Sequence, residues 1–298
     1  ETLGLVGESG CGKSTLGRTL LKLYEPTSGQ IIYSGQDITK LSPREMKPLR
    51  SQMQIIFQDP YSSLNPRKTI GQIITLPLEA HGIGTQSERN LALEQIMSEV
   101  GLPPRLKHSY PSQLSGGQRQ RINIARALAL EPKIVILDEA VSALDKSVEA
   151  QVLNLLLDLK TELGLTYLFI SHDLNVVRYM SDRVMVMYLG KVAEIGPVDA
   201  IYGRTAHPYT SALLSAMPSM DPARRTQQPP LIGDPPSPID PPPGCRFRTR
   251  CPYAEDVCGE RDPVLAAEGG GHYVACQMKK AGSGHSAAPA PIASPPLL

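Results

Sequence analysis

A glycine-rich loop between an apolar strand and a helix constrains this chain more than any other segment. Residues 7–14 read G-E-S-G-C-G-K-S, which matches the pattern G-x-x-x-x-G-K-S. Leu3–Val6 predicts a strand before the loop, and Lys13–Leu23 predicts a helix after it. Glycines let backbone N–H groups wrap a phosphate, and the helix N-terminus adds positive potential. We therefore expect a nucleotide phosphate on Gly7, Glu8, Ser9, Gly10, Cys11, Gly12, Lys13, Ser14 and Thr15.

Two roles inside this loop follow from side-chain chemistry. The Lys13 ammonium would reach the β- and γ-phosphates of ATP, and the Ser14 hydroxyl would bind Mg²⁺. Cys11 needs no chemistry of its own, because a small side chain suits the loop.

A second site, formed by two acidic residues, is predicted at the end of a buried strand. Ile134–Leu137 is short and apolar, and Asp138 and Glu139 follow it directly. Ligands of open α/β sheets bind at the carboxyl ends of the strands. We expect Asp138 to hold Mg²⁺ through water and Glu139 to orient or deprotonate the attacking water. A pair of acids that merely starts a helix is the plainer alternative.

The remaining pattern predicts an α/β fold with a largely parallel sheet, because apolar strands alternate with helical segments up to about residue 217. Further strands are expected at Gln30–Tyr33, Gln54–Phe57 and Thr166–Ile170, and a hairpin at Asp182–Tyr188 and Lys191–Ile195. Helices are expected at Ser87–Val100, Gly117–Leu130 and Lys146–Leu163. Residues 218–244 are rich in proline and read as an extended connection, and 281–298 read as disordered.

Charge and hydropathy exclude two classes of function for the chain alone. It has 298 residues with 30 basic and 29 acidic side chains, which gives no electrostatic footprint for nucleic acid. No apolar run approaches the roughly 20 residues that cross a bilayer. Any role at a membrane must come through partner subunits.

Four further motifs, in order along the chain, carry a family resemblance. Leu114–Gln118 reads L-S-G-G-Q and resembles the signature of the ABC ATPases. Gln58 resembles their Q-loop glutamine, Ser142–Asp145 their D-loop, and His172 their switch histidine. Each motif alone is weak, since Ser115 and the following glycines could simply cap a helix and a histidine after a strand is often structural. Together with the phosphate loop they resemble an ABC ATPase domain.

The resemblance implies a P-loop ABC ATPase fold over residues 1–217, with a mostly parallel sheet and a helical subdomain at about 59–130. It implies that two such domains pair head to tail. ATP would lie between the phosphate loop of one and Ser115, Gly116, Gly117 and Gln118 of the other, with Asp145 nearby. Gln58 would sense the metal and the water, and His172 would contact the γ-phosphate. The family's adenine-stacking aromatic residue would precede Glu1, so we expect this sequence to be a fragment that lacks N-terminal strands.

Three other segments resemble the oligopeptide, dipeptide and nickel branch of ABC importers. They are residues 58–66, residues 206–210 with Leu213-Leu214, and residues 241–252. The resemblance covers about residues 1–278 and implies uptake of short peptides, with nickel, glutathione or opines as alternatives. It also implies two membrane permeases, an extracytoplasmic binding protein and a place on the cytoplasmic face of the membrane.

A cysteine-containing extension is expected over residues 218–280. Cys245, Cys251, Cys258 and Cys276 are separated by five, six and seventeen residues, which fits neither a zinc ribbon nor a ferredoxin. Metal ligation is expected before disulfides. The branch resemblance implies a [4Fe–4S] cluster, while zinc and free thiols stay open. His207 and His272 are possible ligands, although packing roles are the stronger expectation.

Rival classes fit the chain less well. A soluble ABC ATPase acting on ribosomes would carry two such domains, and one acting on DNA would carry a long coiled coil between phosphate loop and signature. Here Lys13 and Ser115 are only about 100 residues apart. A protein that only binds nucleotide conflicts with an intact Glu139.

Overall fold

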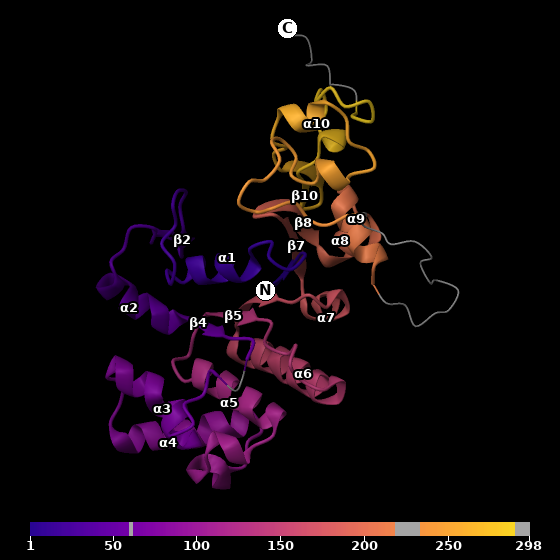
Figure 1. Cartoon of the computed structure of the whole chain (residues 1–298). Helices are drawn as coiled ribbons and strands as arrows, with labels where there is room; N and C mark the ends of the chain where they lie inside the picture. The colour runs from indigo at the N-terminus through magenta and orange to yellow at the C-terminus, as the bar shows by residue number, and fades with distance from the viewer. Residues whose placement is uncertain (60–61, 218–232, 290–298) are drawn as a thin grey trace. The chain divides into compact units, whose positions relative to one another are not determined.

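Two compact units make up the described part of the chain, which is residues 1–59, 62–217 and 233–289 of a computed structural model (Figure 1). The first unit comprises residues 1–2 and 14–171, and the second comprises residues 3–13 and 172 onward. The boundary divides the predicted phosphate loop after Lys13. Each unit is described in turn.

Three neighbouring parallel strands lie in the first unit. β4 (Met53–Ile56) pairs with β5 (Ile134–Asp138), and β5 pairs with β6 (Thr166–Ile170). Val135, Ile136 and Leu137 are buried, as expected for a parallel strand covered on both faces. Helix α1 (Lys13–Leu20) approaches β5 closely, since a Cβ on Gly17 would lie 3.2 Å from Ile136 Cγ2. The predicted strands at 134–137 and 166–170 are confirmed.

Helices fill most of the rest of this unit. Helix α3 contacts both α4 and α5, and α5 also contacts α6. The elements are β2 (Ile32–Tyr33), β3 (Gln36–Asp37), α2 (Pro43–Gln52), α3 (Ile70–His81), α4 (Gln86–Glu99), α5 (Gly116–Leu128), α6 (Lys146–Leu163) and the 3₁₀ turns η1 (Pro104–His108) and η2 (Pro111–Gln113). The strand expected at Gln30–Tyr33 is limited to its last two residues.

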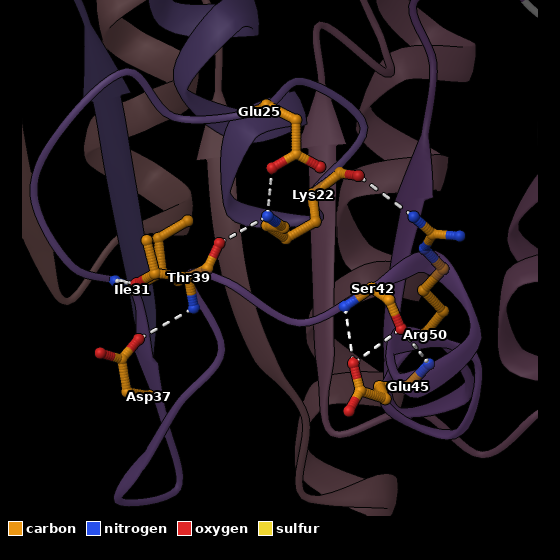
Figure 2. A network of polar contacts seen from close by, with 8 residues as sticks. All are labelled: Lys22, Glu25, Ile31, Asp37, Thr39, Ser42, Glu45 and Arg50. Carbon is orange, nitrogen blue, oxygen red and sulfur yellow. Dashed lines mark hydrogen bonds and ion pairs between the residues drawn. The ribbon is translucent and has the colours of Figure 1, made fainter.

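A buried lysine orders the turn that follows α1. Lys22 has a φ of 54° and is almost fully buried, and its ammonium donates to Thr39 O at 2.5 Å and pairs with Glu25 (Figure 2). Arg50, from α2, donates to Lys22 O at 3.1 Å. A buried ammonium needs such acceptors, because an unpaired one would carry a large desolvation cost. The three segments around residues 22, 39 and 50 are thereby joined.

The second unit is built on a mixed sheet. β1 (Thr2–Val6) runs parallel to β7 (Arg183–Tyr188), and β8 (Lys191–Pro197) runs antiparallel to β7 as predicted. Leu189 and Gly190 both have positive φ, 44° and 79°, which is the backbone of a two-residue hairpin turn.

Strands from the C-terminal region, by which we mean residues 233–289, continue this sheet. β10 (His272–Val274) pairs with β8, and β9 (Ala266–Gly269) pairs with β10. The other elements are α7 (Leu174–Met180), α8 (Val198–Gly203), α9 (Pro208–Ser215), η4 (Arg248–Arg250), α10 (Val257–Glu260) and η5 (Gln277–Lys279). The C-terminal region therefore belongs to the same compact unit as β7 and β8.

Two predictions about the tail meet this structure only in part. Residues 218–232 of the proline-rich connection and 290–298 of the tail lie outside the described residues. Residues 281–289, expected to be disordered, are described: His285 is buried and its Nε2 lies 2.9 Å from Tyr253 O.

Candidate active site

The backbone of the phosphate loop requires its glycines. Gly10 and Gly12 have φ of 79° and 104°, which residues with a Cβ rarely adopt. At Gly7 the obstacle is space, because a Cβ would lie 2.2 Å from Met187 O. Ser9 and Gly10 are exposed, whereas Gly7 and Cys11 are buried. The loop thus follows the path that the G-x-x-x-x-G-K-S pattern predicts.

Lys13 lies over the loop. Its ammonium donates to Gly7 O at 2.8 Å and Glu8 O at 3.2 Å, and its side chain is almost fully buried. Cys11 Sγ lies 4.0 Å from the same nitrogen. Burial raises the pKa of the Cys11 thiol, and the Lys13 charge acts in the opposite direction. The Cys11 side chain is thus packed in the buried part of the loop.

An oxygen-rich pocket in the first unit contains the predicted magnesium ligands. Ser14 Oγ donates to Asp138 Oδ1 at 2.7 Å. A pocket of about 420 Å³ is lined by both side chains and by Gln58, Asp59 and Arg18, among others. Mg²⁺ is commonly held by one or two carboxylates together with water and substrate phosphates, so this donor set fits it. Thr15, next to Ser14, is exposed.

The predicted water-activating carboxylate lies against the predicted Q-loop residue. Gln58 Nε2 donates to Glu139 Oε2 at 3.0 Å, across 81 residues of sequence. Glu139 has a φ of 51°, and its N–H donates to Ile170 O at 3.0 Å. Its carbonyl accepts from Ser142 N at 3.1 Å and from Ser142 Oγ at 2.9 Å. Left-handed backbone at a non-glycine residue carries strain that its surroundings must hold, and such residues gather at functional sites.

The signature residues begin helix α5. Ser115 is its N-cap: its hydroxyl accepts from Gln118 N at 3.3 Å, and Gln118 Oε1 accepts from Ser115 N at 3.1 Å. This reciprocal cap uses two of the amides that a helix N-terminus leaves unpaired. A Cβ on Gly117 would meet Val148 Cγ1 at 2.5 Å, so the signature turn packs tightly on α6. Ser115 and Asp145, the α6 N-cap residue, are both exposed.

The three histidines considered from the sequence differ in exposure: one is exposed and two are buried. His172 is exposed at the start of the second unit's main segment, just before Asp173, which caps α7 by accepting from Asn175 N at 3.0 Å. His207 is buried and accepts from Tyr209 N at 3.0 Å. His272 is buried with its Nε2 2.7 Å from Glu194 Oε1. Packing roles for His207 and His272 agree with these contacts.

The four C-terminal cysteines give no support to a metal cluster. Among residues 1–59, 62–217 and 233–289, no group of three or more His, Cys, Asp or Glu side chains could hold a metal ion. The cysteines are free thiols, and Cys245 N donates to Cys258 O at 2.7 Å. Burial raises the pKa of Cys245 and of Cys276 to about 11, and it also raises that of Cys251. The described residues therefore give the expected [4Fe–4S] cluster no support.

Two residues touch the phosphate loop without having been predicted to do so. Tyr209 OH accepts from Glu8 N at 2.9 Å, and Arg250 forms an ion pair with the Glu8 carboxylate. Both lie in segments that carry the branch resemblance, but they are 201 and 242 residues from Glu8 in sequence. No local pattern signals contacts over such separations.

The Pro60-Tyr61 pair of the Q-loop segment lies outside the described residues. Among the described helices, none combines the length and the hydropathy needed to span a membrane.

Two known families match parts of this chain. The family described as ABC transporter matches residues 1–142, and the family described as Oligopeptide/dipeptide transporter, C-terminal region, matches residues 193–258. A putative peptide import ATP-binding protein of Brucella ovis is 55% identical over 276 residues, covering 93% of this chain and 87% of that protein. The oligopeptide transport ATP-binding protein AppF of Bacillus subtilis is 52% identical over 281 residues, covering 93% and 85%.

Solved structures give the same fold. CbiO1 of Clostridium perfringens, part of the ABC transporter complex cbiONQ, matches with a TM-score of 0.63 and 29% identity, over 68% of this chain and 80% of that one. The ATP-binding cassette MJ0796, in a post-hydrolysis state bound to ADP and Pi, matches with a TM-score of 0.60 and 31% identity, over 66% and 85%. None of these relatives supports a ribosome- or DNA-acting protein. The chain belongs to the ATP-binding proteins of the ABC transporter family, in the branch that carries the oligopeptide/dipeptide transporter C-terminal region.

Proposed function

We propose that this chain is the ATP-hydrolysing subunit of an ABC importer that takes up short peptides. The observation that carries the proposal is the convergence of Ser14, Gln58, Asp138 and Glu139 in the first unit. Ser14 Oγ donates a hydrogen bond to Asp138 Oδ1 at 2.7 Å, and Gln58 Nε2 donates one to Glu139 Oε2 at 3.0 Å. Asp138 and Glu139 lie at the carboxyl end of β5, where open α/β sheets bind ligands.

Magnesium would be held by Ser14 and Asp138, with Gln58 beside it. When bound with ATP, Mg²⁺ neutralises charge on the β- and γ-phosphates. The protein's part is to fix those oxygen donors before the nucleotide arrives, and the Ser14–Asp138 hydrogen bond does so. Lys13 would exchange the Gly7 and Glu8 carbonyls for phosphate oxygens, which are stronger acceptors.

Glu139 would orient the attacking water and accept its proton. The Gln58 carboxamide donates to one carboxylate oxygen of Glu139, which fixes the side chain that would act on water. We assign His172 to the γ-phosphate, because it is exposed at the end of a strand and follows the family order of motifs. Phosphoryl transfer of this kind relies on positioning and electrostatic stabilisation.

The site would be completed by a second ATPase subunit. Ser115 and Asp145 are exposed on the first unit, and the signature turn presents the start of α5 outward. The signature of one subunit would cover the ATP held by the phosphate loop of the other. We propose two permease subunits, an extracytoplasmic binding protein and a place on the cytoplasmic face of the membrane as the setting of this pair. Closure with ATP and opening after hydrolysis would bias the permeases between two states.

Peptides are the substrate class that the relatives favour. The Brucella ovis relative is named for peptide import and AppF for oligopeptide transport. Nickel, glutathione and opines are the competing substrates. The proposed domain boundaries, 1–217 for the ATPase and 218–280 for the extension, follow from the sequence pattern. No step of the reaction is assigned to an iron–sulfur cluster.

The test is Glu139→Gln in the assembled transporter. We expect ATP binding to be retained and hydrolysis to fall at least about 10²-fold, because a positioned base contributes that much or more. Uptake of a labelled tripeptide should fall with it, while uptake of nickel by the same cells stays unchanged. Glu162→Gln, an exposed glutamate on α6, is the control and should behave as the parent. Hydrolysis at the parental rate in Glu139→Gln, or loss of nickel uptake with peptide uptake intact, would overturn the proposal.

A further inference from the structure

The Glu8 side chain of the phosphate loop is gripped by the C-terminal region within the second unit. Arg250 Nη1 donates to Glu8 Oε2 at 2.7 Å and Arg250 Nη2 to Glu8 Oε1 at 3.1 Å. This is a bidentate ion pair, which is stronger and more directional than a pair joined by one hydrogen bond. The Arg250 side chain is 5% exposed and that of Glu8 24%, so water screens the pair less than a surface pair.

The Glu8 backbone is also held by a side chain of the second unit. Its N–H donates to Tyr209 OH at 2.9 Å. Phosphate loops commonly turn their amides toward the phosphate, but this amide is bonded to a side chain from α9. Glu8 is therefore fixed through both its main chain and its side chain. Its own carbonyl is one of the two that hold Lys13.

Buried aromatic rings make the gripping residues rigid. The ring centroids of Tyr188 and Tyr209 are 4.6 Å apart, and Phe247 lies 5.3 Å from each. All three rings are at most 3% exposed. Arg250 also donates to Tyr188 OH at 3.4 Å. Tightly packed rings of this kind cannot move without opening a void.

A second contact anchors the phosphate loop at Cys11. Gly190 N, in the turn between β7 and β8, donates to Cys11 O at 2.8 Å. Arg246, in the C-terminal region, donates to Leu189 O in the same turn. The loop is thus anchored at residues 8 and 11, on either side of exposed Ser9 and Gly10.

We propose that Arg250 and Tyr209 are positioning residues for ATP: they set the place of Glu8 and, through its carbonyl, the place of Lys13. The inference rests on the proposed function of the phosphate loop and adds a role for the C-terminal region in it. A displacement of about 1 Å in a reacting group costs on the order of 10²-fold in rate. Loosening Glu8 should therefore weaken productive ATP binding, because the effect passes through Glu8 and Lys13.

The competing view is that these contacts only attach the C-terminal region. The chain offers a matched control, because Lys191 on β8 pairs with Asp262 in the C-terminal region at 2.6 Å. That pair also attaches the C-terminal region, but to β8 and without a contact to Glu8. Asp262→Asn therefore removes one attaching ion pair and leaves the contacts of Glu8 in place.

The experiment measures KM for ATP and kcat in the assembled transporter for Arg250→Gln, Arg250→Lys, Tyr209→Phe, Glu8→Gln, the double variant E8Q/R250Q, and Asp262→Asn. We expect Arg250→Gln and Tyr209→Phe each to raise KM for ATP about tenfold. Arg250→Lys should give a smaller rise, because lysine pairs with the carboxylate but lacks the fork. The double variant should be no worse than Arg250→Gln alone, and Asp262→Asn should keep the parental KM.

Parental KM values in both Arg250→Gln and Tyr209→Phe would overturn the inference, as would an equal rise in Asp262→Asn. If Arg250→Gln fails to fold, Tyr209→Phe decides, since it removes one hydroxyl and keeps the buried ring. Glu139→Gln, run in parallel, separates the two proposals. If Glu139→Gln loses hydrolysis while Tyr209→Phe and Arg250→Gln keep the parental KM for ATP, only the positioning role is refuted. If Glu139→Gln hydrolyses ATP at the parental rate, the proposed function is refuted.

Discussion

Single buried groups determine how this chain responds to pH, and His207 is the clearest case. Burial lowers the pKa of His207 from 6.5 to about 4, while a backbone hydrogen bond to Ala275 acts in the opposite direction. Its Nδ1 accepts from Tyr209 N, which requires that nitrogen to be unprotonated. Between these two pKa values the unfolded chain binds the proton more readily than the folded one. The stabilisation is therefore complete above pH 6.5 and is lost as the pH falls through 4.

We predict that the lowered pKa of His207 reduces the free energy of unfolding by about 2–3 kcal/mol when the pH falls from 7.5 to 4.5. The measurement is urea unfolding at both pH values for the parent and for His207→Asn. Asparagine keeps an oxygen that can accept from Tyr209 N but does not titrate. The variant should lose less stability on acidification than the parent, and other titrating groups cancel in the comparison. Equal losses would contradict the shift.

At the scale of helices and strands, the close approach of α5 to α6 gives a prediction with a matched pair of glycines. A Cβ on Gly117 would lie 2.5 Å from Val148 Cγ1, whereas one on Gly116 would meet nothing nearer than Leu144 Cδ2 at 3.7 Å. Valine in a helix has one strongly preferred rotamer, so Val148 cannot turn aside. Gly117→Ala gains up to about 1 kcal/mol of helix propensity but should lose more through the clash.

Net destabilisation of about 1–2 kcal/mol is expected for Gly117→Ala, and a neutral or slightly stabilising effect for Gly116→Ala. Thermal unfolding of the two variants beside the parent measures this. Similar unfolding temperatures for both variants would show that the α5–α6 contact tolerates a methyl group at residue 117.

The elements that could be predicted from sequence are those with a complete local signal. The strand at 134–138, the hairpin around Gly190 and the helix after Asp145 are all marked by apolar runs with clear ends. Helices α2 and α3 were missed because Pro48 and Pro77 interrupt their patterns. Their capping boxes, Ser42 with Glu45 and Thr69 with Gln72, were the available signal.

The candidate site divides in the same way. The residue identities of the phosphate loop, Asp138 and Glu139 followed from motif and strand end. The Gln58–Glu139 contact and the grip of Arg250 on Glu8 join residues 81 and 242 positions apart. Such contacts depend on how strands are ordered and packed, which no local pattern encodes.

At the scale of the whole assembly, the exposed signature turn should serve the partner's nucleotide and not the one on its own phosphate loop. Ser115 is the N-cap residue of α5 and is exposed, so its side chain is accessible to a second subunit. Ser115→Arg would fill that surface with a long cation while leaving Lys13 in place. Lys13→Ala would remove the phosphate contact of this chain alone.

The check is photolabelling by an azido-ATP analogue in the assembled transporter, scored separately on this chain and on its partner ATPase subunit. A homodimer is assembled from two differently tagged copies, one of them altered. With Ser115→Arg we expect labelling of this chain to stay within about twofold of the parent and labelling of the partner to fall about tenfold or more, roughly the effect of losing 1.4 kcal/mol of binding. Lys13→Ala should reverse the pattern. If Ser115→Arg instead abolishes labelling of its own chain and spares the partner, each nucleotide is enclosed within one subunit and the head-to-tail pairing is wrong.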